Sequence, residues 1–166
     1  MSTLRALFVL AAALVLQAGL GRLFPGIHRF VDVLLVPVVI YGVSSSQRAA
    51  MGMGCVTGLL SDTWFHGGPF GLNGFKRTLL GWAVGAIATR FDLNQPAGRL
   101  VTGAVVSLAD DVMDFALRGL LDAHPHFPSL LELVVRAVVT GLLVAIGGGM
   151  LDRGRLRRDG RARRVV

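Results

Sequence analysis

Six long apolar segments, separated by short polar turns, follow one another along this chain of 166 residues. They cover residues 4–24, 27–43, 49–65, 75–91, 98–121 and 128–151. The hydrocarbon core of a bilayer is about 30 Å thick and takes roughly 20 helical residues, so four of the segments span it comfortably and two are short. An open sheet cannot exist in lipid, and no segment shows the ten-residue alternation of a barrel strand. The pattern predicts an all-α, polytopic membrane protein with six transmembrane helices.

Composition supports this reading and bounds the domain organisation. Hydrophobic residues make up 53% of the chain and charged residues 16%, and the mean hydropathy is +0.63. Six spans leave only short loops, so we expect one six-helix transmembrane domain over residues 1–151 and a basic cytoplasmic tail over residues 152–166. Five apolar segments follow the first one, which favours an uncleaved first helix over a signal peptide. The lone Cys55 cannot form an internal disulfide and is expected to be a small core residue.

The distribution of basic residues predicts the orientation. With a cytoplasmic N-terminus, eleven arginines lie inside, seven of them in the tail, and six basic residues lie on the other side. The inner set is Arg5, Arg48, Arg90, Arg99, Arg153, Arg155, Arg157, Arg158, Arg161, Arg163 and Arg164, and the outer set is Arg22, Arg29, Lys76, Arg77, Arg118 and Arg136. Positive charge accumulates on the cytoplasmic side, so both termini are expected there. The tail has no interleaved aromatic residue, which favours contact with membrane lipids and no nucleic acid partner.

Small residues recur every four positions in three of the segments. Gly54 and Gly58 form a GxxxG pair in the third, and Gly81 begins a similar series in the fourth. A further series in the sixth consists of Ala137, Gly141, Ala145 and Gly149. Such stripes let two helices approach closely, either within the bundle or against a partner's helix, and the sequence leaves both alternatives open.

The fifth segment carries a cluster of charges inside an apolar stretch. Asp110, Asp114 and Arg118 are four residues apart and share one helical face, with Asp111 beside them. Each aspartate at mid-bilayer costs roughly 2.5–3.5 kcal/mol, so these side chains are expected to face protein, a wet cavity or the interface. Three alternatives remain: neutralisation by Arg118, by Arg136 or by protonation; a polar seam for a partner; and a cation or proton site.

Two local features predict further detail. Pro37 lies midway along the second segment and is expected to kink it or to end its first half. Glu132 and Arg136 are four residues apart and are expected to pair.

Groupings typical of catalysis are missing from the sequence. The four histidines lie in outer loops or at segment ends, and no third ligand accompanies the closest pair. They are His28, His66, His124 and His126. No serine occupies a nucleophile elbow, and no glycine-rich loop ends in Lys followed by Ser or Thr. We therefore expect no enzyme, no metal site and no cofactor.

The densest local pattern covers residues 58–82. A helix with a small-residue face ends near Asp62, a Gly/Pro segment follows, and the next helix begins with the basic pair Lys76 and Arg77. Asp62 is expected to pair with one of these cations across the hairpin, and Asn73 is a candidate cap for the second helix.

This stretch resembles MreD, the small integral-membrane subunit of the bacterial cell-elongation (rod-shape) machinery. The matching pattern is Gly-Leu-Leu-x-Asp at 58–62, Pro-Phe-Gly-Leu-x-Gly-Phe at 69–75 and Thr-Leu-x-Gly-Trp at 78–82. Asp32, which opens the second segment and precedes Val-Leu-Leu, is also similar to that family. The partner-binding or structural residues expected from the motif and its glycine stripe are Gly54, Gly58, Asp62, Pro69, Gly71, Asn73, Lys76, Arg77 and Gly81.

The resemblance implies a non-catalytic scaffold in the bacterial inner membrane. MreD-like proteins associate with the single-span protein MreC, and through it with RodA, its transpeptidase partner and the actin-like MreB filament. The family's fold is similar to the substrate-binding subunits of energy-coupling-factor vitamin transporters. That similarity supplies the alternative, a membrane subunit that binds a vitamin or lipid in an outward cavity gated by the 65–77 loop.

Overall fold

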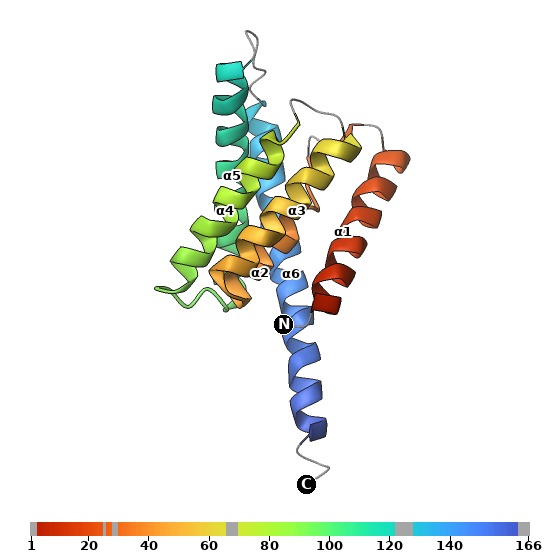
Figure 1. Cartoon of the computed structure of the whole chain (residues 1–166), viewed down its shortest axis with the longest axis vertical. Helices are drawn as coiled ribbons and strands as arrows, with labels where there is room; N and C mark the ends of the chain where they lie inside the picture. Colours follow the sequence, from red (N-terminus) through yellow and green to blue (C-terminus); the bar gives the residue numbers. More distant parts are fainter. Residues whose placement is uncertain (1–2, 25, 28–29, 66–69, 122–127, 163–166) are drawn as a thin grey trace.

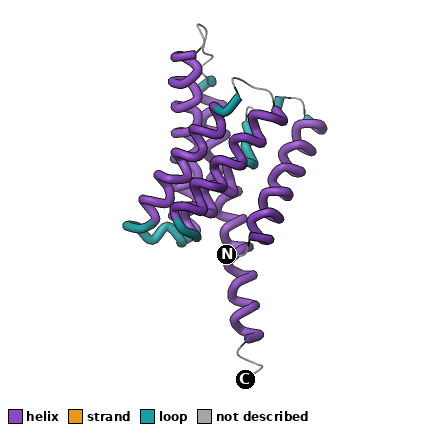
Figure 2. Tube along the Cα trace, in the orientation of Figure 1, coloured by secondary structure: helices purple, strands orange, loops and turns teal. Residues whose placement is uncertain are grey.

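The computed structural model describes residues 3–24, 26–27, 30–65, 70–121 and 128–162, and every regular element within these ranges is a helix (Figure 2). The six helices are α1 (Thr3–Leu23), α2 (Leu35–Ser44), α3 (Gln47–Phe65), α4 (Leu72–Ala88), α5 (Pro96–Leu121) and α6 (Leu130–Ala162). Successive helices alternate in direction, and α1 begins at the end of the bundle where α6 ends (Figure 1). The all-α prediction is confirmed.

Two of the described helices are long and apolar enough to cross a membrane by length and composition. They are the Ala6–Leu23 part of α1 and the Leu130–Leu151 part of α6. The helices α2 and α4 have only 10 and 17 residues, and α5 carries the charged cluster predicted from the sequence. The criterion of length and hydropathy therefore supports two spans, and the other four need a different argument.

The second apolar segment forms a helix over only part of its length. Helix α2 begins at Leu35 rather than near residue 27, and Pro37 lies in its first turn. A proline costs no hydrogen bond there, because the first N–H groups of a helix have no partner within it. The expectation that Pro37 kinks a longer helix is therefore wrong. The non-helical residues before α2 instead carry Asp32 into the interior, where its Oδ1 accepts a hydrogen bond from the Leu34 N–H at 3.1 Å.

Helix α6 starts on a capping box and continues beyond the expected end of the membrane domain. The backbone N–H of Ser129 donates to Glu132 Oε2 at 2.9 Å, and the Glu132 N–H donates to Ser129 Oγ at 3.3 Å. Glu132 is thus a capping residue, and the predicted pair with Arg136 is wrong. The helix runs to Ala162, so most of the segment expected to be a separate tail continues α6.

The apolar core is centred on α2, which is buried over eight of its ten residues. It packs against α4, α5 and α6, and the buried cluster consists of Leu35, Val39, Ile40, Val43, Leu80, Val84, Val106 and Val144. Helix α1 stands at the edge of the bundle (Figure 1). Its attachment is a smaller cluster, in which Ala13 packs with Val33 and Leu34. Beside this cluster, Gln17 Oε1 accepts a hydrogen bond from the Val33 N–H at 2.7 Å.

Candidate functional site

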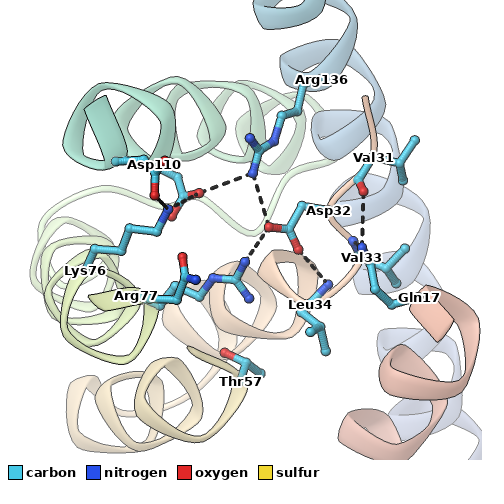
Figure 3. Close-up of polar contacts among 12 residues, drawn as sticks. Gln17, Val31, Asp32, Val33, Leu34, Thr57, Lys76, Arg77, Asp110 and Arg136 are labelled. Atoms are coloured by element: carbon cyan, nitrogen blue, oxygen red, sulfur yellow. Dashed lines mark hydrogen bonds and ion pairs between the residues drawn. The ribbon is translucent and has the colours of Figure 1, made fainter. Parts of the chain in front are cut away.

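A network of buried and partly buried ionic side chains joins the residues before α2 to α4, α5 and α6 (Figure 3). Its four carboxylates and four cations are Asp32, Asp110, Asp111, Asp114, Lys76, Arg77, Arg118 and Arg136. The formal charges cancel. We call this set the ionic network.

Lys76 neutralises the aspartate cluster of α5. Its Nζ donates to Asp110 Oδ2 at 3.1 Å and to Asp114 Oδ1 at 2.8 Å, which confirms that these two carboxylates share one face of α5. Asp114 also accepts a hydrogen bond from Arg118 Nε at 2.6 Å. Lys76 is only 3% exposed although it lies in the first turns of α4. Sequence reasoning placed it on the outer side of the membrane and missed it as the counter-ion.

Arg136 connects the remaining carboxylates from its position on α6. Its Nη2 lies 3.2 Å from Asp32 Oδ2 and 3.3 Å from Asp110 Oδ2, and its Nη1 donates to Asp111 Oδ1. Asp32 Oδ2 also accepts a hydrogen bond from Arg77 Nη2 (Figure 3). Of the alternatives for the α5 cluster, neutralisation by basic side chains is the arrangement present, with Arg118 and Arg136 as expected and Lys76 in addition.

Asp62 caps helix α4 rather than pairing with a cation. Its carboxylate accepts hydrogen bonds from the backbone N–H groups of Gly71 at 2.9 Å, Asn73 at 3.3 Å and Gly74 at 3.2 Å. The side-chain Nδ2 of Asn73 donates to the same carboxylate at 2.7 Å. Both expectations for this hairpin are therefore wrong: Asp62 does not pair with Lys76 or Arg77, and Asn73 is not the cap. Gly71 has a φ of +92°, a left-handed conformation that favours glycine.

The glycines of the third and fourth segments bring α3 and α4 into backbone contact. A Cβ on Gly54 would overlap the carbonyl oxygen of Arg77, and one on Gly58 would overlap that of Asn73. From the other side, a Cβ on Gly81 would lie 2.5 Å from the Ala50 carbonyl oxygen. The sequence left open whether these glycines pack within the bundle or against a partner's helix. They pack within the bundle.

Two cavities differ in size and lining. One of 160 Å³ adjoins the ionic network and has a mainly polar lining; we call it the polar cavity. One of 590 Å³ lies between the start of α1 and the start of α3. Its walls include Ala6, Leu7 and Leu10 of α1 and Ala49, Gly52 and Val56 of α3, with serines 44–46 at one end; we call it the α1–α3 groove. Pockets for drug-sized ligands occupy roughly 300–1,000 Å³, so the polar cavity is too small for a vitamin.

Some sequence predictions fall outside the described residues. Pro69 of the motif and the four histidines lie there, as do the last two arginines of the chain. The signal for the ionic network was present in the sequence as a balance of charge: basic residues in apolar segments need acidic partners, and Asp32 was available. Linear spacing could not show that Asp32, Lys76 and Arg136 meet, because they are far apart along the chain.

Comparison with protein-family models, with curated proteins and with solved structures found no match. The similarity of the fold to vitamin-transporter subunits and the membership of the MreD family stay predictions. The functional argument therefore depends on the geometry described above.

Proposed function

We propose that all six helices of this chain lie in a bilayer, with both termini on the cytoplasmic side. The observation that supports this is an inverted distribution of polarity. Phe8 and Leu120 are 75% and 82% exposed, whereas Lys76, Arg77 and Asp110 are at most 3% exposed. Proteins in water expose charge and bury large apolar side chains. In lipid this preference reverses. Apolar side chains face the acyl chains, and charged side chains lie inside the bundle, where they pair with counter-ions.

The arrangement of the helices supports the same topology. Alternating directions and chain ends on one side fit an even number of crossings (Figure 1). The short α2 is surrounded by other helices, so its ten residues need not match the full bilayer thickness. The excess of basic residues at the end where α1 begins favours a cytoplasmic location for that end.

We further propose that the protein is a non-catalytic scaffold of the bacterial cell-elongation complex, located in the inner membrane. It would bind MreC and, through MreC, act with RodA, its transpeptidase partner and MreB. The single observation that carries this proposal is that the MreD-like stretch forms a hairpin, α3 and α4, which is held together at its loop and along its length. Asp62 fastens the hairpin at its loop, and backbone contacts at Gly54 and Gly81 fasten it along its length. A rigid hairpin suits a protein that positions others.

The α1–α3 groove is our assignment for the MreC span. The lining is largely apolar, and no described residue from beyond the adjacent turns of α3 comes within 4 Å of where a Cβ on Gly52 would be. A helix can approach such a glycine closely, which favours association in lipid. Helix α1 packs on the bundle mainly through residues from Ala13 onward, so its first turns are available to a partner.

Filling the groove tests this assignment. Gly52→Leu places a bulky side chain in the groove, and we expect recovery of co-expressed, tagged MreC in a pull-down to fall at least tenfold. Gly19→Leu is the matched control, because Gly19 is also an exposed helical glycine with open space but does not line the groove. Both variants should be recovered from membranes in native amounts. Equal MreC recovery with the two variants would contradict the assignment, and an absence of MreC with the native chain would contradict the scaffold function itself.

A further inference from the structure

More basic than acidic side chains line the polar cavity. Four basic side chains and two acidic ones line it, which leaves two net positive charges. They are Lys76, Arg77, Arg118, Arg136, Asp32 and Asp114. Asp110 and Asp111, which complete the neutral ionic network, do not line it.

Hydrogen-bond donors of the protein already contact the two carboxylates that line this cavity. The Oδ1 of Asp32 accepts from the Leu34 N–H, and its Oδ2 accepts from Arg77 and Arg136. The Oδ1 of Asp114 accepts from Lys76 at 2.8 Å, and its Oδ2 accepts from an arginine at 2.6 Å. Each of these four oxygens thus accepts at least one hydrogen bond from the protein.

Hydrogen-bond donors on two lining residues have no partner within the described ranges, whereas the unpaired acceptors of the ionic network, Asp110 Oδ1 and Asp111 Oδ2, belong to residues that do not line the cavity. The side chain of Arg77 is 3% exposed, yet its Nε and Nη1 have no partner in the described part of the chain. The buried Nε of Arg136 also has no hydrogen-bond partner among the described residues. Buried N–H groups are paired in nearly all proteins, so unpaired ones on two residues of one cavity indicate a binding partner that accepts hydrogen bonds.

We propose that the polar cavity binds a small oxyanion, a carboxylate or phosphate group held by Arg77 and Arg136. The excess of positive charge and the unpaired guanidinium N–H groups both favour such a group, because arginine matches carboxylate and phosphate oxygens. The volume of 160 Å³ corresponds to about five water molecules at roughly 30 Å³ each, which suits phosphate or acetate and excludes a vitamin. The oxyanion is either a free ion or the phosphate of a lipid headgroup.

Thermal unfolding of the purified full chain in detergent tests the proposal. Inorganic phosphate and acetate should each raise the unfolding midpoint saturably, by about 3 °C at a concentration tenfold above Kd. Sodium chloride at matched ionic strength should not. Shifts no larger than those with chloride would overturn the proposal.

Variants of the cavity wall locate the effect. Ser61 lines the cavity without belonging to the ionic network, so Ser61→Leu fills the space and should abolish the shift, whereas Ser61→Ala should retain it. If Ser61→Leu does not fold, Arg118→Gln serves instead, because the Arg118 side chain is 31% exposed at the edge of the network. This change should raise the half-saturating phosphate concentration at least fivefold. An unchanged shift in the variant that folds would overturn the site.

Native mass spectrometry of the protein extracted from its membrane distinguishes the two sources. A retained phospholipid that phosphate displaces identifies a headgroup, and a lipid-free protein that still responds to phosphate identifies a free ion. The inference does not depend on MreC, since the cavity and the α1–α3 groove share no lining residue. Ser61→Leu should therefore leave MreC recovery unchanged, so either proposal can fail alone.

Discussion

Helix α3 has one closed face and one open face, and glycine occurs on both. On the closed face, Gly54 and Gly58 contact the backbone of α4 so tightly that neither tolerates a Cβ. On the open face, Gly52 borders the α1–α3 groove, and nothing in the described chain beyond the adjacent turns of α3 lies within 4 Å of its Cβ position. The same residue type thus contributes to folding on one side and leaves room on the other.

The difference shows which residues of the 58–82 motif are structural. The motif residues Gly58, Asp62 and Gly81 all serve the joint between α3 and α4. The groove is lined by residues outside that motif, from α1, the end of α2 with the turn after it, and the first half of α3. A partner helix therefore has room beside Gly52 but none beside Gly54 or Gly58.

The largest effect on stability should come from removing the charge of Arg77, which joins α4 to Asp32. Arg77→Met leaves Asp32 with Arg136 as its one ion-pair partner among the described residues. Breaking a buried ion pair from one side costs about 3–5 kcal/mol, because the remaining charge is poorly compensated. We expect a fall of that size in the free energy of unfolding, measured by denaturant titration in mixed micelles.

The control for this change is an exposed arginine near the end of the same hairpin. Arg90 is exposed and lies outside the ionic network, so Arg90→Met should change stability by less than about 0.5 kcal/mol. A similar loss of unfolding free energy in both variants would mean that the buried ion pairs do not set the stability of the protein.

The next largest effect tests the closed face directly. Gly54→Ala forces α3 and α4 apart, because the added Cβ meets a backbone carbonyl that cannot move alone. Overpacking of this kind costs about 1–3 kcal/mol. Gly52→Ala, two residues away on the open face, should be neutral or stabilising by up to about 1 kcal/mol, since alanine is the better helix former. Equal unfolding midpoints for the two variants would remove the distinction between the faces.

Sequence reasoning succeeded where a property depends on neighbours along one helix. The number and order of the helices followed from the apolar segments, and the shared face of Asp110 and Asp114 followed from their spacing of four. Both depend only on helical periodicity. The small-residue stripes were also recognised as packing faces, but the sequence could not say what they pack against.

Sequence reasoning failed where a side chain has candidate partners both nearby and far away along the chain. Arg136 had Glu132 one turn away but pairs with Asp32, Asp110 and Asp111, because Glu132 is used in the cap of α6. Asp62 had nearby cations, yet it binds the N–H groups at the start of α4. Competition of this kind is decided by where the helices cross and by unsatisfied backbone groups, neither of which linear spacing reveals.

The smallest predicted effect concerns this cap at the loop end of the closed face. Asp62 accepts hydrogen bonds from two backbone N–H groups, those of Gly71 and Gly74, through Oδ2 alone, and its charge lies at the positive end of the α4 dipole. Asp62→Ala removes both contributions and should cost about 1–2 kcal/mol in the same unfolding assay. Asp62→Asn keeps one acceptor oxygen but directs an NH₂ group at donors, so it should recover little of the loss. If Asp62→Asn instead matched the native stability, the carboxylate would be dispensable, and the backbone contacts of Gly54 and Gly58 alone would hold the hairpin closed.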